Sequence, residues 1–116
     1  MAVPDYQSLM LPLMKMASDE KDHTLQDAYT TLAAQFKLSD AERNEVLPSG
    51  RQSKFQNRAG WARTYLKKAG LLETPARSIF HITKRGLEVL KTNPVSINAA
   101  FLRQFPEFVA FQKATH

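Results

Sequence analysis

The sequence predicts a single, mainly α-helical domain that also contains one small β-hairpin, an α+β fold. The chain has 116 residues, the length of one ordinary domain, and 43% of them are hydrophobic, which is enough to bury one core and excludes general disorder. Apolar residues recur at three- and four-residue steps in several segments, as amphipathic helices require. Two short apolar runs around a basic turn predict the hairpin.

The first third of the chain predicts three helices. Pro4, Thr24 and Ser39 each stand where a helix can begin, Pro4 through its fixed backbone angle and the two hydroxyl residues as caps. Pro12 lies inside the first apolar pattern and should bend that helix, because it removes one backbone hydrogen bond. An acidic link at 19–22 separates the first two helices. The predicted helices cover about 4–17, 24–36 and 39–46.

A fourth, longer helix is predicted over residues 54–69. Ser53 can cap its start, and Gly70 stands where a left-handed residue would end it. Its apolar residues form a stripe about 80° wide, which is the buried face. The opposite face holds no acidic residue. Gly60 on this face costs about 1 kcal/mol in mid-helix, which the close approach of a partner would explain.

The hairpin is predicted from residues 71–72 and 79–82, joined by a turn that carries Arg77. It lies in a basic block, residues 46–85, which holds nine basic residues and one acidic residue, whereas residues 1–45 hold four basic and eight acidic. The predicted order is helices, then a basic helix, a hairpin and a further helix. This is the element order of a winged helix-turn-helix domain, which belongs to the DNA/RNA-binding three-helical bundles. There the basic helix enters the major groove and the hairpin, or wing, lies along the backbone.

The candidate DNA-binding residues come from the basic block. Arg63, Thr64 and Lys67 lie on the exposed face of the predicted basic helix and are expected to contact phosphates or bases. Arg58 and Trp61 favour structural roles, the first in an ion pair with an acid of residues 1–45 and the second in packing. The full candidate set is Arg51, Lys54, Gln56, Asn57, Gly60, Arg63, Thr64, Lys67, Lys68, Arg77 and Lys84.

The end of the chain predicts a different kind of segment. Thr83 can cap a last regular helix that ends by Asn93-Pro94. Beyond it, residues 96–116 contain four of the seven phenylalanines, and Pro106 divides them into two short helical pieces. We therefore expect a winged-helix domain over 1–95, followed by a Phe-rich helical extension over 96–116 that packs on the domain or on a dimer partner.

The composition excludes several kinds of site. The chain has no cysteine, and its histidines, His23, His81 and His116, lack the spacing of metal ligands, so we expect isolated surface or edge histidines, no metal and no cofactor. No apolar run approaches the roughly 20 residues that cross a bilayer, and the start of the chain lacks a basic leader. We therefore expect a cytoplasmic protein that does not contact membranes.

Residues 57–71, Asn-Arg-Ala-Gly-Trp-Ala-Arg-Thr-Tyr-Leu-Lys-Lys-Ala-Gly-Leu, are the most distinctive stretch. Together with PDYQSLMLPL at 4–13, PSGRQ at 48–52, ITKRG at 82–86 and FLRQFPEF at 101–108, they resemble the amino-terminal domain of Mrr-type restriction proteins. The resemblance implies a winged-helix module that binds DNA and precedes a nuclease domain. The parent proteins of this family are type IV restriction endonucleases, which cut DNA that carries modified bases. The positions that match the family are Asn57, Arg58, Gly60, Trp61, Leu66, Lys67 and Gly70.

The chain departs from such nucleases in one respect. They hold Mg²⁺ on a carboxylate and a (D/E)-x-K tripeptide of adjacent strands, and this chain is too short for that second domain. Asp5 with Asp19-Glu20-Lys21 matches the letters, but these residues lie on a predicted helix and in a link, so we expect no catalysis by this chain. Two alternatives stay open: a protein-interaction or assembly module, and a stand-alone dimeric transcription regulator. The expected partners are duplex DNA, a nuclease domain or subunit, and a second copy bound through the Phe-rich tail.

Overall fold

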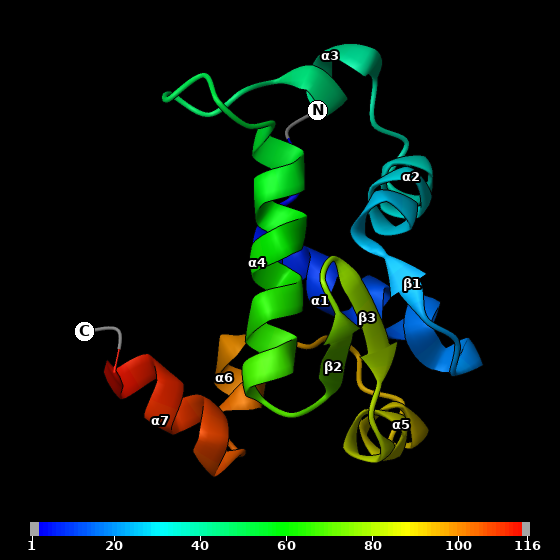
Figure 1. Ribbon diagram of the computed structural model, residues 1–116, viewed down its shortest axis with the longest axis vertical. Coiled ribbons are helices and arrows are strands. Elements are labelled where there is room, and N and C mark those ends of the chain that lie inside the picture. The colour runs from blue at the N-terminus through cyan, green and yellow to red at the C-terminus, as the bar shows by residue number, and fades with distance from the viewer. Residues whose placement is uncertain (1–2, 115–116) are drawn as a thin grey trace.

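The computed structural model describes residues 3–114 and is a mainly helical α+β fold with one three-stranded antiparallel sheet (Figure 1). The expected mixture of helices and a small hairpin is therefore confirmed. In chain order the elements are α1 (Tyr6–Met16), a short 3₁₀ helix η1 (Ala17–Asp19), β1 (His23–Thr24), α2 (Leu25–Gln35), α3 (Asp40–Asn44), α4 (Lys54–Lys68), β2 (Leu72–Ala76), β3 (Ile79–Ile82), α5 (Lys84–Lys91), α6 (Ala99–Leu102) and α7 (Pro106–Ala114).

The predicted helix caps are present. The hydroxyl oxygens of Thr24, Ser39, Ser53 and Thr83 each accept a hydrogen bond from the backbone N–H three residues later, at 3.0 to 3.1 Å. Each bond satisfies one of the backbone donors that a helix start leaves free. Gly70 has φ +79°, the left-handed conformation expected after α4.

Two helices differ from the prediction in detail. α1 begins at Tyr6 rather than at Pro4 and is continuous through Pro12; the bend expected at this proline stays a prediction. α3 stops at Asn44, sooner than predicted, because Val46 leaves the helix and forms an isolated antiparallel bridge with Ser53. This bridge closes the loop 46–53 over the start of α4.

The sheet contains one strand more than the predicted hairpin. β1 pairs antiparallel with β3, so the strand order is β1-β3-β2 and β3 is central. β1 has two residues, too few for the alternating pattern that reveals a strand in a sequence. β2 extends to Ala76, which shortens the turn of the hairpin to Arg77 and Ser78. Ser78 takes the left-handed conformation, with φ 63°.

The core lies where α1 and α4 pack together. Both helices contribute fully buried residues, and the small side chains Ala59 and Ala62 let the backbone of α4 approach its neighbours. The buried residues of these two helices are Leu9, Met10, Leu13, Met14, Phe55, Ala59, Ala62 and Leu66. Because the apolar stripe of α4 faces α1, its polar face points outward.

The part of the Phe-rich tail that the structure describes, residues 96–114, packs on its own chain. The Phe108 side chain is fully buried, and its ring centre lies 5.4 Å from that of Tyr65 on α4. Arg85 Nη1 donates to the carbonyl of Ala69, at 2.9 Å, and to Glu107, at 2.6 Å, and so links α4, α5 and α7. The division into 1–95 and 96–116, and a dimer through the tail, stay predictions. Met1, Ala2, Thr115 and His116 lie outside the described residues.

Within residues 3–114, no helix is both long enough and apolar enough to cross a membrane.

Candidate nucleic-acid interface

The outward face of α4 is bordered by the hairpin. Figure 1 shows β2 and β3 running beside the lower half of α4, with their turn pointing toward the middle of that helix. The loop 46–53 lies at the start of α4. Two hollows open on this surface, and each combines residues from separate parts of the sequence.

The first hollow, of about 470 Å³, lies between α4 and the hairpin turn, and we call it the basic groove. It is lined by Arg63, Lys67, Thr74, Ala76, Arg77 and Ser78. No carboxylate is among these residues, so the positive charges of two arginines and one lysine reinforce one another. The structure therefore brings together three of the predicted cations, Arg63, Lys67 and Arg77.

Arg63 is the most enclosed of these three cations. Its Nε atom is buried and has no hydrogen-bond partner within the described part of the chain. Burial raises the pKa of Tyr29, and the neighbouring Arg63 guanidinium works against that increase. Arg63 therefore lies between α2 and the hairpin, where it lines both hollows.

The hairpin turn is fixed in place by α2. The backbone N–H of Leu25, the first residue of α2, donates to the carbonyl of Ser78 at 3.0 Å. This bond continues the pairing of β1 with β3, in which Thr24 lies opposite Ile79. Arg77 therefore extends from a two-residue turn that is tied at its side, so its position relative to α4 is largely set before any ligand binds.

The second hollow, of about 290 Å³, lies over Gly60, and we call it the Gly60 hollow. Its lining residues are Leu25, Tyr29, Gln52, Asn57, Gly60, Trp61, Arg63 and Thr64. The Asn57 side-chain amide donates a hydrogen bond to the side-chain carbonyl oxygen of Gln52, at 3.1 Å. Trp61 remains 49% exposed, although one side of it contacts Tyr65 with ring centres 6.1 Å apart. In this hollow the candidate residues Asn57, Gly60 and Thr64 thus lie beside the apolar side chains of Leu25, Tyr29 and Trp61.

Other candidate residues lie outside both hollows. Lys54 forms an ion pair with Glu45, and the Lys68 ammonium lies 5.4 Å from the centre of the Phe111 ring. Lys84 begins α5, at the end of β3 that is distant from the hairpin turn. Arg51 is exposed in the loop 46–53. DNA contacts by these four residues stay predictions.

Gln56 lies in a separate hollow of about 260 Å³ between α2, α3 and the start of α4. That hollow also contains the acidic side chain of Asp40 beside Arg43. A carboxylate at this place weakens attraction for a phosphate, in contrast to the basic groove.

Arg58 does not form the expected ion pair. Its Nη1 atom donates to the carbonyl of Val3, at 2.8 Å, and to that of Pro4, at 3.3 Å. The pKa of Asp5 is lowered chiefly by the backbone N–H of Ser8, with a smaller contribution from the Arg58 charge. Arg58 therefore holds the N-terminal segment against α4, through carbonyl groups that a charge pattern does not reveal.

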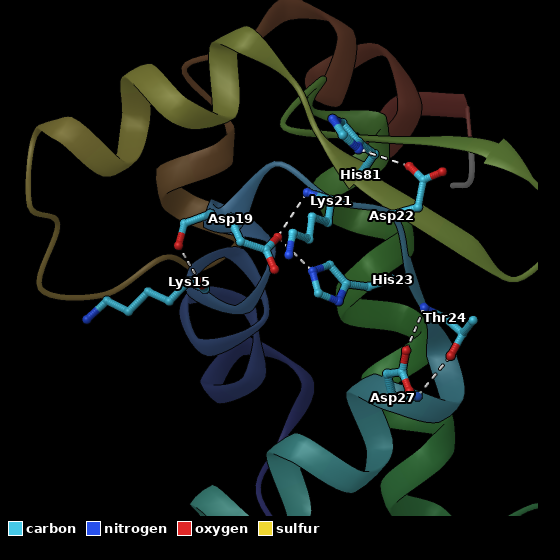
Figure 2. Close-up of polar contacts among 9 residues, drawn as sticks. Lys15, Asp19, Lys21, Asp22, His23, Thr24, Asp27 and His81 are labelled. Atoms are coloured by element: carbon cyan, nitrogen blue, oxygen red, sulfur yellow. Dashed lines mark hydrogen bonds and ion pairs between the residues drawn. The ribbon is translucent and has the colours of Figure 1, made fainter.

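The two described histidines are paired with aspartates, contrary to the expectation that they are isolated. Figure 2 shows Asp19 facing the ring of His23, at 2.8 Å, and Asp22 facing that of His81, at 3.0 Å. His81 also lies on the central strand, β3, rather than at an edge. The spacing of Asp19 and His23 could have revealed the first pair, but 59 residues separate the second pair.

The nuclease-like letters do not form a metal site. Asp5 accepts a hydrogen bond from the Ser8 N–H and caps the start of α1, whereas Asp19 lies just beyond its end. A helix of 11 residues separates them by roughly 16 Å. Within residues 3–114, no group of three or more His, Asp or Glu side chains is arranged to hold a metal ion.

Comparison with known proteins gives one family. Residues 6–92 match the family described as the Mrr N-terminal domain. The protein named "Type IV methyl-directed restriction enzyme EcoKMrr" of Escherichia coli (strain K12) is 32% identical over 95 residues, which are 81% of this chain and 31% of that protein. The chain thus spans about a third of the length of this relative. No solved structure matches significantly. The family match covers most of the chain, which therefore belongs to the Mrr N-terminal domain family.

Proposed function

We propose that this domain is a winged helix that binds duplex DNA, with α4 as the recognition helix and the β2–β3 hairpin as the wing. The order α1, β1, α2, α3, α4, β2, β3, in which the short helix α3 lies between α2 and α4 and β3 is central in the sheet, supports this assignment. In such domains the helix that precedes the hairpin enters the major groove. Here α4 buries its apolar stripe against α1 and leaves its polar face free to do so.

The basic groove is the observation that carries the proposal. Arg63 and Lys67 come from the helix and Arg77 from the wing, and no carboxylate is among the residues that line the groove. Phosphate oxygens accept hydrogen bonds from guanidinium and ammonium groups, and such contacts supply most of the non-specific affinity for DNA. We assign these three residues to the DNA backbone, and Asn57, Gly60 and Thr64 to the edges of the bases.

The restriction context comes from the relative. EcoKMrr is described as a methyl-directed restriction enzyme, and this chain corresponds to about a third of it. We infer that the domain delivers a nuclease domain or subunit to methylated DNA and does not itself cut. The basic face fits binding rather than Mg²⁺ chemistry, because a metal site needs several carboxylates together.

Binding to DNA is tested by fluorescence anisotropy with a labelled duplex of random sequence, measured over a range of NaCl concentrations. Three phosphate contacts predict a plot of log K against log salt with a slope of about −2.7. Absence of binding, or affinity that salt leaves unchanged, would contradict the proposal. A salt-insensitive complex with another protein would instead favour an assembly module.

A further inference from the structure

We infer that the Gly60 hollow is the part of the interface that recognises a methylated base. This inference rests on the proposed function, because it requires α4 to lie in the major groove of DNA. Its ligand is a base edge that carries a methyl group beside an amino N–H. In duplex DNA 5-methylcytosine offers this combination in the major groove, because one of its two N4 hydrogens stays outside the base pair, whereas the single N6 hydrogen of N6-methyladenine pairs with thymine.

The glycine itself is the first observation. Gly60 does not have a positive φ, and a Cβ atom built on it would meet nothing within 4 Å. Neither backbone conformation nor packing therefore requires glycine here, although glycine in mid-helix costs about 1 kcal/mol relative to alanine. A surface that must approach the α4 backbone closely gives Gly60 a reason to lack a side chain.

The second observation is the apolar wall beside Gly60. Leu25 and Tyr29 of α2 are partly buried there, and Trp61 is half exposed. Among the described residues, the large hydrophobic side chains exposed to solvent are Val46, Trp61 and Val95, and Trp61 is the one that belongs to α4. An indole left in water on an otherwise polar helix face can bury apolar surface against a methyl group.

Asn57 supplies the polar part of the recognition. Its amide nitrogen donates one hydrogen to the Gln52 side-chain oxygen, and its carbonyl oxygen can accept a hydrogen bond from a base amino group. This acceptor can bind the free N4 hydrogen of 5-methylcytosine, a donor that thymine, with a methyl group at the same ring position, does not offer. N6-methyladenine presents its methyl group in the groove but no free amino hydrogen. The hollow therefore pairs a methyl contact with a hydrogen-bond acceptor.

The test compares three pools of short random duplexes: unmodified, made with 5-methyl-dCTP, and made with N6-methyl-dATP. Burial of one methyl group predicts about fourfold tighter binding of a methylated pool. Trp61 is the single tryptophan of the chain, so its fluorescence reports occupation of the hollow directly. We expect a larger change of Trp61 emission at saturation with the preferred methylated pool than with the unmodified pool.

Two substitutions change the hollow, and a third substitution, outside it, serves as the control. Gly60→Leu fills it, in open space on a helix that leucine favours, and Trp61→Ala removes one wall. Trp61→Ala should abolish the preference for methylated DNA while the unmodified pool still binds, whereas Gly60→Leu should also weaken binding to every pool, because its side chain blocks the close approach of the bases to α4. Lys67→Ala should weaken binding to all pools by the same factor, because its proposed contact is a phosphate. Circular dichroism melting curves check that each variant folds.

The outcomes separate the two proposals. If the wild-type domain binds all three pools equally, this inference is wrong and the DNA-binding function stands. If the preference exists but survives in both Gly60→Leu and Trp61→Ala, the hollow is not the reader. A preference for the 5-methylcytosine pool that both variants lose supports the inference, whereas a preference for the N6-methyladenine pool contradicts the role given to the Asn57 acceptor. If no pool binds, the proposed function fails, and the inference fails with it.

Discussion

Replacing Lys67 and Arg77 together by alanine should change the salt dependence of DNA binding in a calculable way. The basic groove contains three cations, and each phosphate neutralised contributes about 0.9 to the slope of log K against log salt. Three contacts predict a slope of about −2.7, so a fourfold increase in salt should weaken binding by about 40-fold. With Arg63 alone left in the groove, the slope should be about −0.9 and the same increase should cost about fourfold.

The matched control replaces Lys91 and Lys113 by alanine. These lysines are also exposed, but they lie on α5 and α7, outside both hollows. Both double variants lower the net charge by the same amount, so overall charge alone would affect them equally. Binding is measured by anisotropy at several NaCl concentrations, with thermal melting to show that these surface changes leave stability within about 0.5 kcal/mol. Equal loss of slope in the two variants, or an unchanged slope after Lys67→Ala with Arg77→Ala, would refute the phosphate assignment.

Three further predictions concern stability and catalysis. Phe108→Ala should lower the free energy of unfolding by about 3 to 5 kcal/mol in urea titrations, independently of protein concentration, because this ring is fully buried in its own chain; a concentration-dependent loss would point to a dimer contact instead. Hydrogen bonds from the His23 ring and then the Lys21 N–H lower the pKa of Asp19 below its ordinary value of 3.8. Its stabilising contribution is therefore present above that value and lost as the pH falls below it, so Asp19→Asn should flatten the acid side of the Tm-against-pH curve; an unchanged curve would contradict this. The purified domain should not nick methylated or unmethylated supercoiled plasmid with Mg²⁺ or Mn²⁺, and cleavage that disappears in Asp19→Ala would overturn the binding-only proposal.

Local signals were sufficient for the helices. Thr24, Ser39, Ser53 and Thr83 cap the helices where the sequence predicts, because a cap depends on groups only three residues apart. Gly70 ends α4 for a similarly local reason. The density of positive charge between residues 46 and 85, and the family of the chain, were also readable without coordinates.

Tertiary structure decided which charges act together. Lys54, Lys68 and Lys84 carry the same charge as Lys67, yet the first pairs with Glu45, the second lies over Phe111 and the third begins α5. The surroundings of these lysines depend on segments distant in sequence. The local sequence around each of them therefore does not distinguish it from Lys67.

The same reason accounts for the features that sequence reasoning missed. β1 exists only because β3 is available to pair with it, and a strand of two residues has no periodicity of its own. The carbonyl groups that hold Arg58 belong to the N-terminal segment, and the aspartate that faces His81 lies 59 residues away. The sequence by itself determined the helices, the caps at their starts, the end of α4 and the positive block. Long-range pairing of β1 with β3 determined the position of the wing and hence the geometry of the basic groove, because backbone hydrogen bonds between distant segments form only when the whole chain has folded.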